Sequence, residues 1–254
     1  MATQENTWGN VLCRQGVPNT PSGFLGTTVL TGCRCCRLFR VYALNMSRIP
    51  TTNGARRTRD RVLNAALDLF NERGSASVTT NHVAARAGIS PGNLYYWFSD
   101  KNEIVRELYA QFVAEYERLW GSGQGDPLLL SPDEVLARLG DGAALSRRYA
   151  FLARDLLGML HGDPVLAAEY RAVRERRIAE FTDLAGAWRA RGLIRPLDDA
   201  TVADLVRALW VIAETWLAFG EFDDSYPDVE HGTRLLRVVL QPYLTPELGA
   251  VATS

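Results

Sequence analysis

The chain has 254 residues, 47% of them hydrophobic and 9% aromatic, so it can bury the core of one large domain or two modest ones. No stretch approaches the roughly 18–20 unbroken apolar residues of a membrane span, and the N-terminus lacks the basic start and apolar run of a secretory signal. Residues 47–120 carry ten Lys or Arg against eight Asp or Glu, and residues 121–254 carry fourteen against twenty, which favours a nucleic-acid module joined to a domain with another role.

Residues 1–54 differ in composition from the rest of the chain, being rich in Gly, Thr, Pro and Asn with a single acidic residue. They show no sustained hydrophobic period and predict a disordered tail, or a segment ahead of an alternative translation start at Met46. All four cysteines lie here, without a paired CxxC or a nearby His, so we expect neither a metal site nor a cofactor. Folding without disulfides is consistent with a reducing cytoplasm.

The first helix is expected from about Arg56. Its apolar stripe recurs at helical spacing and consists of Val62, Leu63, Ala66, Leu69 and Phe70. Gly74 follows as a residue suited to end the helix. Thr79 or Thr80 is expected to cap a short second helix, which ends at Gly88.

Two further helices follow. Ser90 is expected to cap a third helix that has Pro91 at its first position, where a missing N–H costs nothing, and that runs to about Trp97. Asp100 is expected to cap a fourth helix. Its apolar stripe consists of Ile104, Val105, Leu108, Tyr109, Phe112, Tyr116 and Leu119.

The second and third helices meet at a Gly-centred turn within residues 79–98. Ala84 and Ala87 are small enough for the helices to approach closely, and Ile89, Leu94 and Phe98 can lock the third helix onto the second. A helix-turn-helix needs this geometry to hold its second helix out into a major groove. The sequence therefore predicts a DNA-binding domain over residues 55–100.

The N-terminus of the third helix can approach base edges through Pro91, Gly92 and Asn93, and Gly92 lets the backbone itself come close. Three aromatic residues follow in a row, Tyr95, Tyr96 and Trp97. Because successive helical residues point about 100° apart, at least one must be exposed. A Tyr hydroxyl suits a phosphate oxygen and an aromatic face suits a thymine methyl; Tyr95 and Trp97 can instead belong to the core.

Lys101 is the only lysine in the chain and lies at the start of the fourth helix. A cation there opposes the helix dipole unless an anion such as a DNA phosphate lies opposite. A solvated surface lysine is an equally open interpretation.

Residues from about 58 to 105 resemble the DNA-binding domain of the tetracycline-repressor (TetR) family. The matching text is Ala65-Ala66-Leu67-Asp68-Leu69-Phe70 with Gly74, then Val83-Ala84 with Ala87-Gly88-Ile89-Ser90, then Gly92-Asn93-Leu94-Tyr95-Tyr96-Trp97-Phe98 and Lys101. The resemblance implies that the helix over residues 91–97 enters the major groove. It also implies phosphate contacts from Thr79 or Thr80, Tyr96 and Lys101.

Two positions depart from the family pattern. Trp97 stands where His is common, so an imidazole contact to phosphate is replaced at best by an indole N–H. Pro91 stands where Lys or a polar residue is frequent, which shifts base recognition to Asn93, Tyr95 and the backbone. The Arg cluster at residues 56, 57, 59 and 61 is either an arm on the DNA backbone or minor groove, as in the family, or a solvated basic tail.

Residues 101–245 predict a second, all-helical domain, with 246–254 as a tail. After a linker over residues 121–132, helices are expected at about 132–140, 143–160, 164–191, 199–220 and 228–243. The resemblance implies that this domain binds a ligand and forms a dimer. The helix near 199–220 is apolar almost all round, and with Leu235 to Leu240 it could build a four-helix interface between two copies, which suits a palindromic DNA site.

A ligand cavity is expected inside this domain. Its candidate lining residues are Phe112, Tyr116, Tyr149, Arg154, Asp155, Trp188, Trp210 and Glu214, although residues of these types belong to a core or an interface more often than they contact a ligand. For Arg154 and Asp155 a structural ion pair or a surface pair is the favoured interpretation. Arg174, Arg176 and Arg177, with Glu175 and Glu180, predict a solvated helix face.

The sequence thus predicts an all-α protein with an N-terminal three-helix helix-turn-helix domain and a C-terminal helical ligand-binding and dimerisation domain. The expected function is a homodimeric regulator, in family terms most often a repressor, released from a palindromic operator on double-stranded DNA by an unknown small-molecule effector. An enzyme is not expected, because no His lies in a metal spacing or beside a nucleophile and no Gly-rich phosphate loop is present. A regulator controlled by a protein partner without a ligand remains the alternative.

Overall fold

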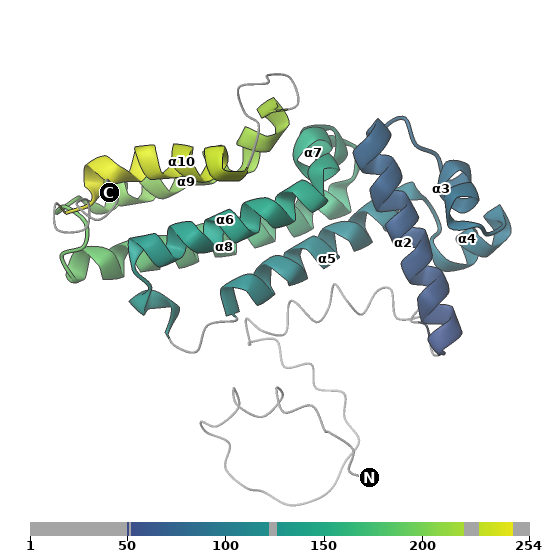
Figure 1. The fold of residues 1–254 in the computed structure, drawn as a ribbon, viewed down its shortest axis with the longest axis horizontal. Helices are drawn as coiled ribbons and strands as arrows, with labels where there is room; N and C mark the ends of the chain where they lie inside the picture. Colours follow the sequence, from purple (N-terminus) through teal and green to yellow (C-terminus); the bar gives the residue numbers. More distant parts are fainter. Residues whose placement is uncertain (1–49, 51, 122–125, 221–228, 246–254) are drawn as a thin grey trace, which may run out of the picture. The chain divides into compact units, whose positions relative to one another are not determined.

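The computed structural model describes residues 50, 52–121, 126–220 and 229–245. The Met46 alternative, nearly all of the predicted N-terminal tail, the predicted 246–254 tail and part of the predicted linker lie outside these residues. The regular secondary structure within them is helical, joined by turns and short irregular segments, with one isolated bridge between Ile194 and Leu244 (Figure 1). None of the described helices is long and apolar enough to span a membrane.

Three helices form the helix-turn-helix domain: α2 (Asn53–Arg73), α3 (Thr80–Ala87) and α4 (Pro91–Trp97). Helix α2 begins slightly before the predicted start at Arg56, because the Thr52 hydroxyl accepts a hydrogen bond from the backbone N–H of Ala55. Thr79 caps α3 by accepting from the N–H of His82, whose imidazole accepts from the Thr79 N–H in return.

The turn between α3 and α4 forms as predicted. Gly88 ends α3 with φ of 66°, in the left-handed region that a Cβ disfavours. Ser90 caps α4 through the N–H of Asn93, and Pro91 occupies the first helical position. These local contacts fix the angle at which α4 leaves α3.

Helix α5 (Lys101–Gly121) follows α4 almost directly. The Asp100 carboxylate accepts from the N–H of Glu103 at 2.8 Å, and the buried Glu103 carboxylate accepts from the N–H of Ser99 at 2.6 Å. The first hydrogen bond confirms the predicted cap, and the second ties the start of α5 to the end of the DNA-binding domain.

The C-terminal domain contains α6 (Pro132–Arg148), α7 (Ala150–Gly162), α8 (Pro164–Ala190), α9 (Asp199–Gly220) and α10 (Val229–Leu240). The short 3₁₀ helices η3 (Pro127–Leu129) and η4 (Gln241–Tyr243) flank them. Helix α6 packs against α5 and α10, while α9 packs against α7, α8 and α10 (Figure 1).

The predicted helix break between residues 140 and 143 is wrong, since α6 continues through Gly140 and Gly142. A Cβ built on Gly142 would lie 2.8 Å from the Tyr116 ring. Gly142 therefore serves close helix packing rather than helix termination. The break comes at Tyr149, which separates α6 from α7.

One hydrophobic core spans the DNA-binding domain and the adjoining end of the C-terminal domain. It contains buried side chains from α2, α3, α4, α5, α7 and α8, and the rings of Phe70 and Phe151 pack within it at 5.2 Å between centroids. A second core lies among α6, α8, α9 and α10 and includes Leu136, Trp188 and Leu236. Through the first core, the DNA-binding domain packs directly against α5 and α7.

Candidate DNA-binding surface and internal cavity

The exposed face of α4 carries the predicted recognition residues. Tyr95 and Tyr96 are 49% and 69% exposed, whereas Leu94 and Trp97 are 0% and 7% exposed. The exposed set at the start of the helix comprises Pro91, Gly92 and Asn93. Two of the three consecutive aromatic side chains of α4 are therefore exposed to solvent.

Trp97 lies in the core, which was the alternative interpretation of its sequence position. Its ring meets that of Tyr96 edge-on, with 4.8 Å between centroids. Its indole nitrogen is buried and has no hydrogen-bond partner within the described part of the chain. Because this nitrogen is buried, it is not available on the exposed face of α4 for a contact to phosphate.

The two threonines at the start of α3 differ in their contacts. The Thr79 hydroxyl is engaged as the helix cap. The Thr80 hydroxyl lies 3.0 Å from the phenolic oxygen of Tyr95, joining α3 to α4 on the exposed side. A phosphate contact from Thr80 would therefore also orient the Tyr95 ring.

Lys101 has an intramolecular partner that the sequence did not reveal. Its ammonium donates to the carbonyl oxygen of Ser75 at 2.7 Å, in the loop after α2. Arg59 is likewise held, by a two-pronged pair with Glu107 at 2.9 and 3.1 Å. Arg56, Arg57 and Arg61 are exposed, so the basic cluster offers these three side chains to an anionic partner.

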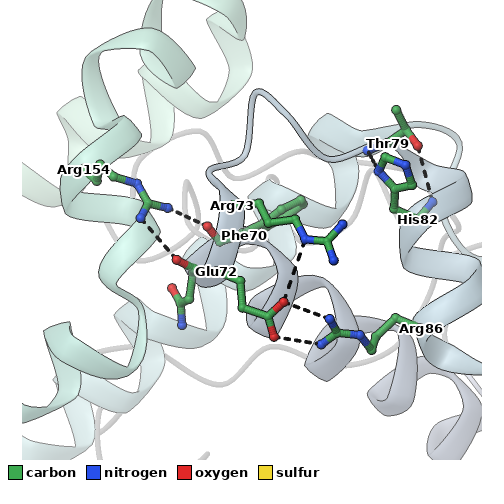
Figure 2. A network of polar contacts seen from close by, with 8 residues as sticks. Phe70, Glu72, Arg73, Thr79, His82, Arg86 and Arg154 are labelled. Carbon is green, nitrogen blue, oxygen red and sulfur yellow. Dashed lines mark hydrogen bonds and ion pairs between the residues drawn. The ribbon is translucent and has the colours of Figure 1, made fainter.

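A bidentate ion pair stiffens the helix-turn-helix. The Arg86 guanidinium on α3 donates to both carboxylate oxygens of Glu72 on α2, at 3.0 and 2.8 Å (Figure 2). The hydrogen bond from Arg86 is the main cause that lowers the pKa of the Glu72 carboxyl. Both groups are exposed, so water and salt screen the pair.

Arg154 joins the two domains. Its guanidinium donates to the carbonyl oxygens of Phe70 at 2.5 Å and Asn71 at 3.2 Å, at the C-terminal end of α2 (Figure 2). It pairs with the neighbouring Asp155, which accepts from the Ser75 N–H at 2.6 Å. Arg154 and Asp155 do not line the cavity described next, so their place among the predicted cavity residues is corrected to this junction.

An internal cavity of about 210 Å³ lies within the C-terminal domain. Six of the predicted side chains line it: Phe112, Tyr116, Tyr149, Trp188, Trp210 and Glu214. The rest of the lining is mostly aliphatic or aromatic and comes from α5 through α10. An apolar enclosure with a few polar groups is typical of small-molecule sites.

Glu214 is the one acidic residue among the described residues that line the cavity. Its carboxylate accepts from the Tyr170 hydroxyl at 2.5 Å and from the indole N–H of Trp210 at 3.2 Å. Burial, followed by the adjacent Glu214 carboxylate, raises the pKa of the Tyr170 hydroxyl and keeps it protonated as a donor.

The predicted solvated face of α8 needs correction. Arg176 does lie outside, paired with Glu117 and Glu180. Arg177 is instead buried and lines the cavity, as Arg174 does one turn earlier. The run of charged residues gave no sign that Arg176 and Arg177 lie on different faces of α8. The helical spacing of Tyr170, Arg174, Arg177 and Phe181 could have predicted that these four residues share one face.

Apolar side chains are exposed on the two C-terminal helices. Val211 and Phe219 on α9 are 49% and 62% exposed, and Val238 on α10 is 59% exposed. Of α9, only Val202, Val206 and Trp216 are fully buried. The two helices therefore leave apolar surface uncovered in a single copy of the chain.

The described architecture is that of a helix-turn-helix protein with a helical companion domain, and comparison with known proteins agrees. The model for "Bacterial regulatory proteins, tetR family" matches residues 62–108, and the model for "Bacterial transcriptional repressor" of the TetR type matches residues 131–250. The chain belongs to the TetR family of bacterial transcriptional regulators.

Individual relatives point the same way. A helix-turn-helix transcriptional regulator of Mycobacterium tuberculosis, Rv1255c, is 31% identical over 166 residues, which are 62% of this chain and 74% of the relative. The Bacillus subtilis regulator YdeS is 28% identical over 114 residues, or 45% of this chain and only 55% of its own length. Both relatives are transcriptional regulators of the helix-turn-helix type.

A solved structure supports the fold over most of the chain. The TetR-family regulator from Marinobacter aquaeolei superposes with a TM-score of 0.68 at 28% identity, covering 74% of this chain and 92% of that one. The comparison confirms the predicted all-α fold with its N-terminal helix-turn-helix and C-terminal helical domain.

Proposed function

We propose that this regulator represses transcription as a homodimer bound to a palindromic operator and leaves the DNA when a small molecule enters the cavity. The exposed face of α4 is the observation that carries the proposal. Asn93, Tyr95 and Tyr96 face outward there, while Leu94 and Trp97 anchor the helix in the core. A rigid helix presenting polar and aromatic groups fits direct readout in a major groove.

The proposed DNA contacts divide into two kinds. Asn93, Tyr95 and the backbone at Pro91 and Gly92 would contact base edges. Thr79, Thr80, Ser90, Tyr96 and Lys101 would position the domain on phosphates. The division is testable, because phosphate contacts change affinity on all sequences and base contacts change discrimination between them.

Dimerisation would pair α9 and α10 of one copy with the same helices of a second. The exposed Val211, Phe219 and Val238 would then be covered, as apolar surface of this kind normally is. Such an isologous contact has two-fold symmetry and would present two α4 helices to two half-sites.

Two helices could carry the signal from the cavity to the DNA. Phe112 and Tyr116 of α5 line the cavity, while the same helix begins next to α4. On α7, Leu152 and Leu156 line the cavity, and Arg154 between them holds the C-terminal end of α2. A ligand that shifts either helix would move the DNA-binding domain, and a coupling of roughly 1–3 kcal/mol would change DNA affinity about 5–150-fold.

The repressor assignment has a direct test. In a purified transcription reaction, adding the chain should lower the transcript from a promoter that contains its operator and leave a promoter without it unchanged. An increased transcript would identify an activator instead. Binding to DNA with no change in either transcript would contradict both roles.

A further inference from the structure

The cavity contains a buried cation whose hydrogen-bonding capacity is not filled. Arg177 on α8 is 8% exposed and lines the cavity. Its Nη1 donates to Glu180 at 2.8 Å, toward the half-exposed outer side of the helix. Its Nη2 is buried and has no partner in the part of the chain that the structure describes. A buried N–H left unpaired is costly, and most such groups in proteins find an acceptor.

Arg177 contacts an aromatic ring within the mostly apolar cavity lining. Its guanidinium carbon lies 5.5 Å from the centre of the ring of Tyr116, a partly buried residue of the cavity lining. In this low-polarity setting a charged hydrogen bond is stronger than it would be in water. An acceptor supplied by a bound molecule would therefore gain more here than at the protein surface.

The charges that line the cavity favour an anion. Among the described lining residues, the charged ones are Arg174, Arg177 and Glu214. The Glu214 carboxylate already accepts two hydrogen bonds, from Tyr170 and Trp210. The cationic groups outnumber the acidic one, and the acidic one is engaged with protein donors.

We propose that the cavity binds a compact amphipathic carboxylate, whose acid group pairs with Arg177 and whose apolar body lies against the aromatic and aliphatic lining. This inference rests on the proposed effector role of the cavity and specifies the ligand class. A volume of about 210 Å³ lies below the roughly 300–1,000 Å³ of typical ligand pockets, which favours a small body. The guanidinium fork matches a carboxylate in two-point geometry.

The test uses matched ligands that differ in the head group alone. Phenylbutyrate, phenylbutyramide and phenylbutylamine form one series, and decanoate, decanamide and decylamine form a second with a longer body. Binding to the full chain without DNA is measured by titration calorimetry near neutral pH. In the series that binds more tightly, the affinity for the carboxylate should exceed the affinity for the amide by about tenfold or more. The amine should bind more weakly than either.

Two variants locate the anion site. Arg177→Gln should reduce the carboxylate preference to within about threefold while retaining the affinity for the amide. Arg176→Gln is the matched control, because it removes the same charge one residue away on the outer face, and it should keep the full preference. Thermal unfolding of both variants establishes that the fold is retained, and Arg177→Met gives a second substitution if glutamine destabilises the helix.

Several outcomes would overturn the inference. These are equal binding of amide and carboxylate, tightest binding of the amine, no binding in either series, or an unchanged preference in Arg177→Gln. DNA release is then measured separately with the tightest carboxylate. Binding at Arg177 without DNA release would contradict the effector role in the proposed function and leave the anion site standing.

Discussion

At the scale of single residues, the proposed DNA interface depends on which atoms of α4 are exposed to solvent. Gly92 is exposed, and a Cβ built there meets nothing within 4 Å of the protein. Packing therefore gives no reason for a glycine at this helical position. A close approach of the backbone to DNA does, because a methyl group would stand between the helix and the base edges.

Gly92→Ala should thus leave the fold intact or stabilise it by up to about 1 kcal/mol, while weakening operator binding. Chemical denaturation and a DNA titration measure the two effects. Gly158→Ala on α7, where a Cβ also meets nothing, is the control and should leave DNA affinity unchanged. Full operator affinity in Gly92→Ala would mean that the backbone does not approach the DNA there.

Substitution of Tyr96 or of Lys101 should weaken DNA binding, but the two substitutions should differ in how the DNA affinity depends on salt concentration. Lys101→Gln removes a charge and should reduce the slope of log affinity against log salt by about 1, whereas Tyr96→Phe removes a neutral hydroxyl and should leave the slope unchanged. Both should act on operator and unrelated DNA alike. Unchanged affinity in both variants would contradict the phosphate assignment. Because Lys101 also donates to Ser75, unfolding of that variant is measured in parallel.

At the scale of secondary-structure elements, the Glu72–Arg86 pair fixes α2 against α3. The pKa of Glu72 is lowered in the folded chain, so its contribution to stability is present above the ordinary carboxyl pKa and is lost as pH falls through the folded value. Near neutral pH, the free energy of unfolding of the unchanged chain should be larger than that of the Glu72→Gln variant by a small margin. That margin should shrink as the pH falls below about 4.

Asp60→Asn is the control for this experiment, since Asp60 is an exposed carboxylate on the same helix. It removes a carboxylate from α2 without touching the Glu72–Arg86 pair. A margin between the chain and Glu72→Gln that is independent of pH would assign the effect to packing rather than to the charged pair.

Arg154 tests whether α7 couples the domains. Arg154→Met would remove the charged donor from the carbonyl groups of Phe70 and Asn71, of which Phe70 keeps the Gly74 N–H, so we expect a loss of roughly 1–3 kcal/mol in unfolding free energy. The variant should also respond less to a cavity ligand in DNA release. Arg171→Met, an exposed arginine on α8, should change neither quantity. Undiminished release in Arg154→Met would assign the coupling to α5 alone.

The elements also show where prediction from the sequence succeeded. The caps at Ser90 and Asp100 and the turn at Gly88 were predictable because each depends on contacts within a few residues. The break expected near residue 140 was wrong because Gly142 serves the approach of Tyr116 from another helix. A local pattern does not reveal a partner so distant in the chain.

The candidate site divides in the same way. The exposed Tyr96 and the aromatic cavity lining followed from residue type and helical period. The junction role of Arg154 and the burial of Arg177 did not, because both depend on tertiary neighbours. A charged residue in a run of charges looks solvated until the packing of its helix is known.

At the scale of the whole molecule, the account requires two copies of the chain. Val238→Glu places a charge on exposed apolar surface of α10 and should convert the proposed dimer to a monomer with weakened operator binding. Leu157→Glu is the control, since Leu157 is 71% exposed on α7, a helix that is not part of the proposed interface. Light scattering gives the mass of each; a monomeric parent chain, or a dimeric Val238→Glu, would contradict the proposed interface.

Recognition of one operator by the paired α4 helices is the central claim. Fluorescence anisotropy of labelled DNA from the chain's own promoter region, titrated with the full chain against unlabelled unrelated DNA, tests it most directly. The account predicts tight binding that resists the competitor and saturates at one dimer per palindrome. Weak binding that the competitor abolishes, on every fragment of that region, would contradict it and favour a regulator that acts through a protein partner.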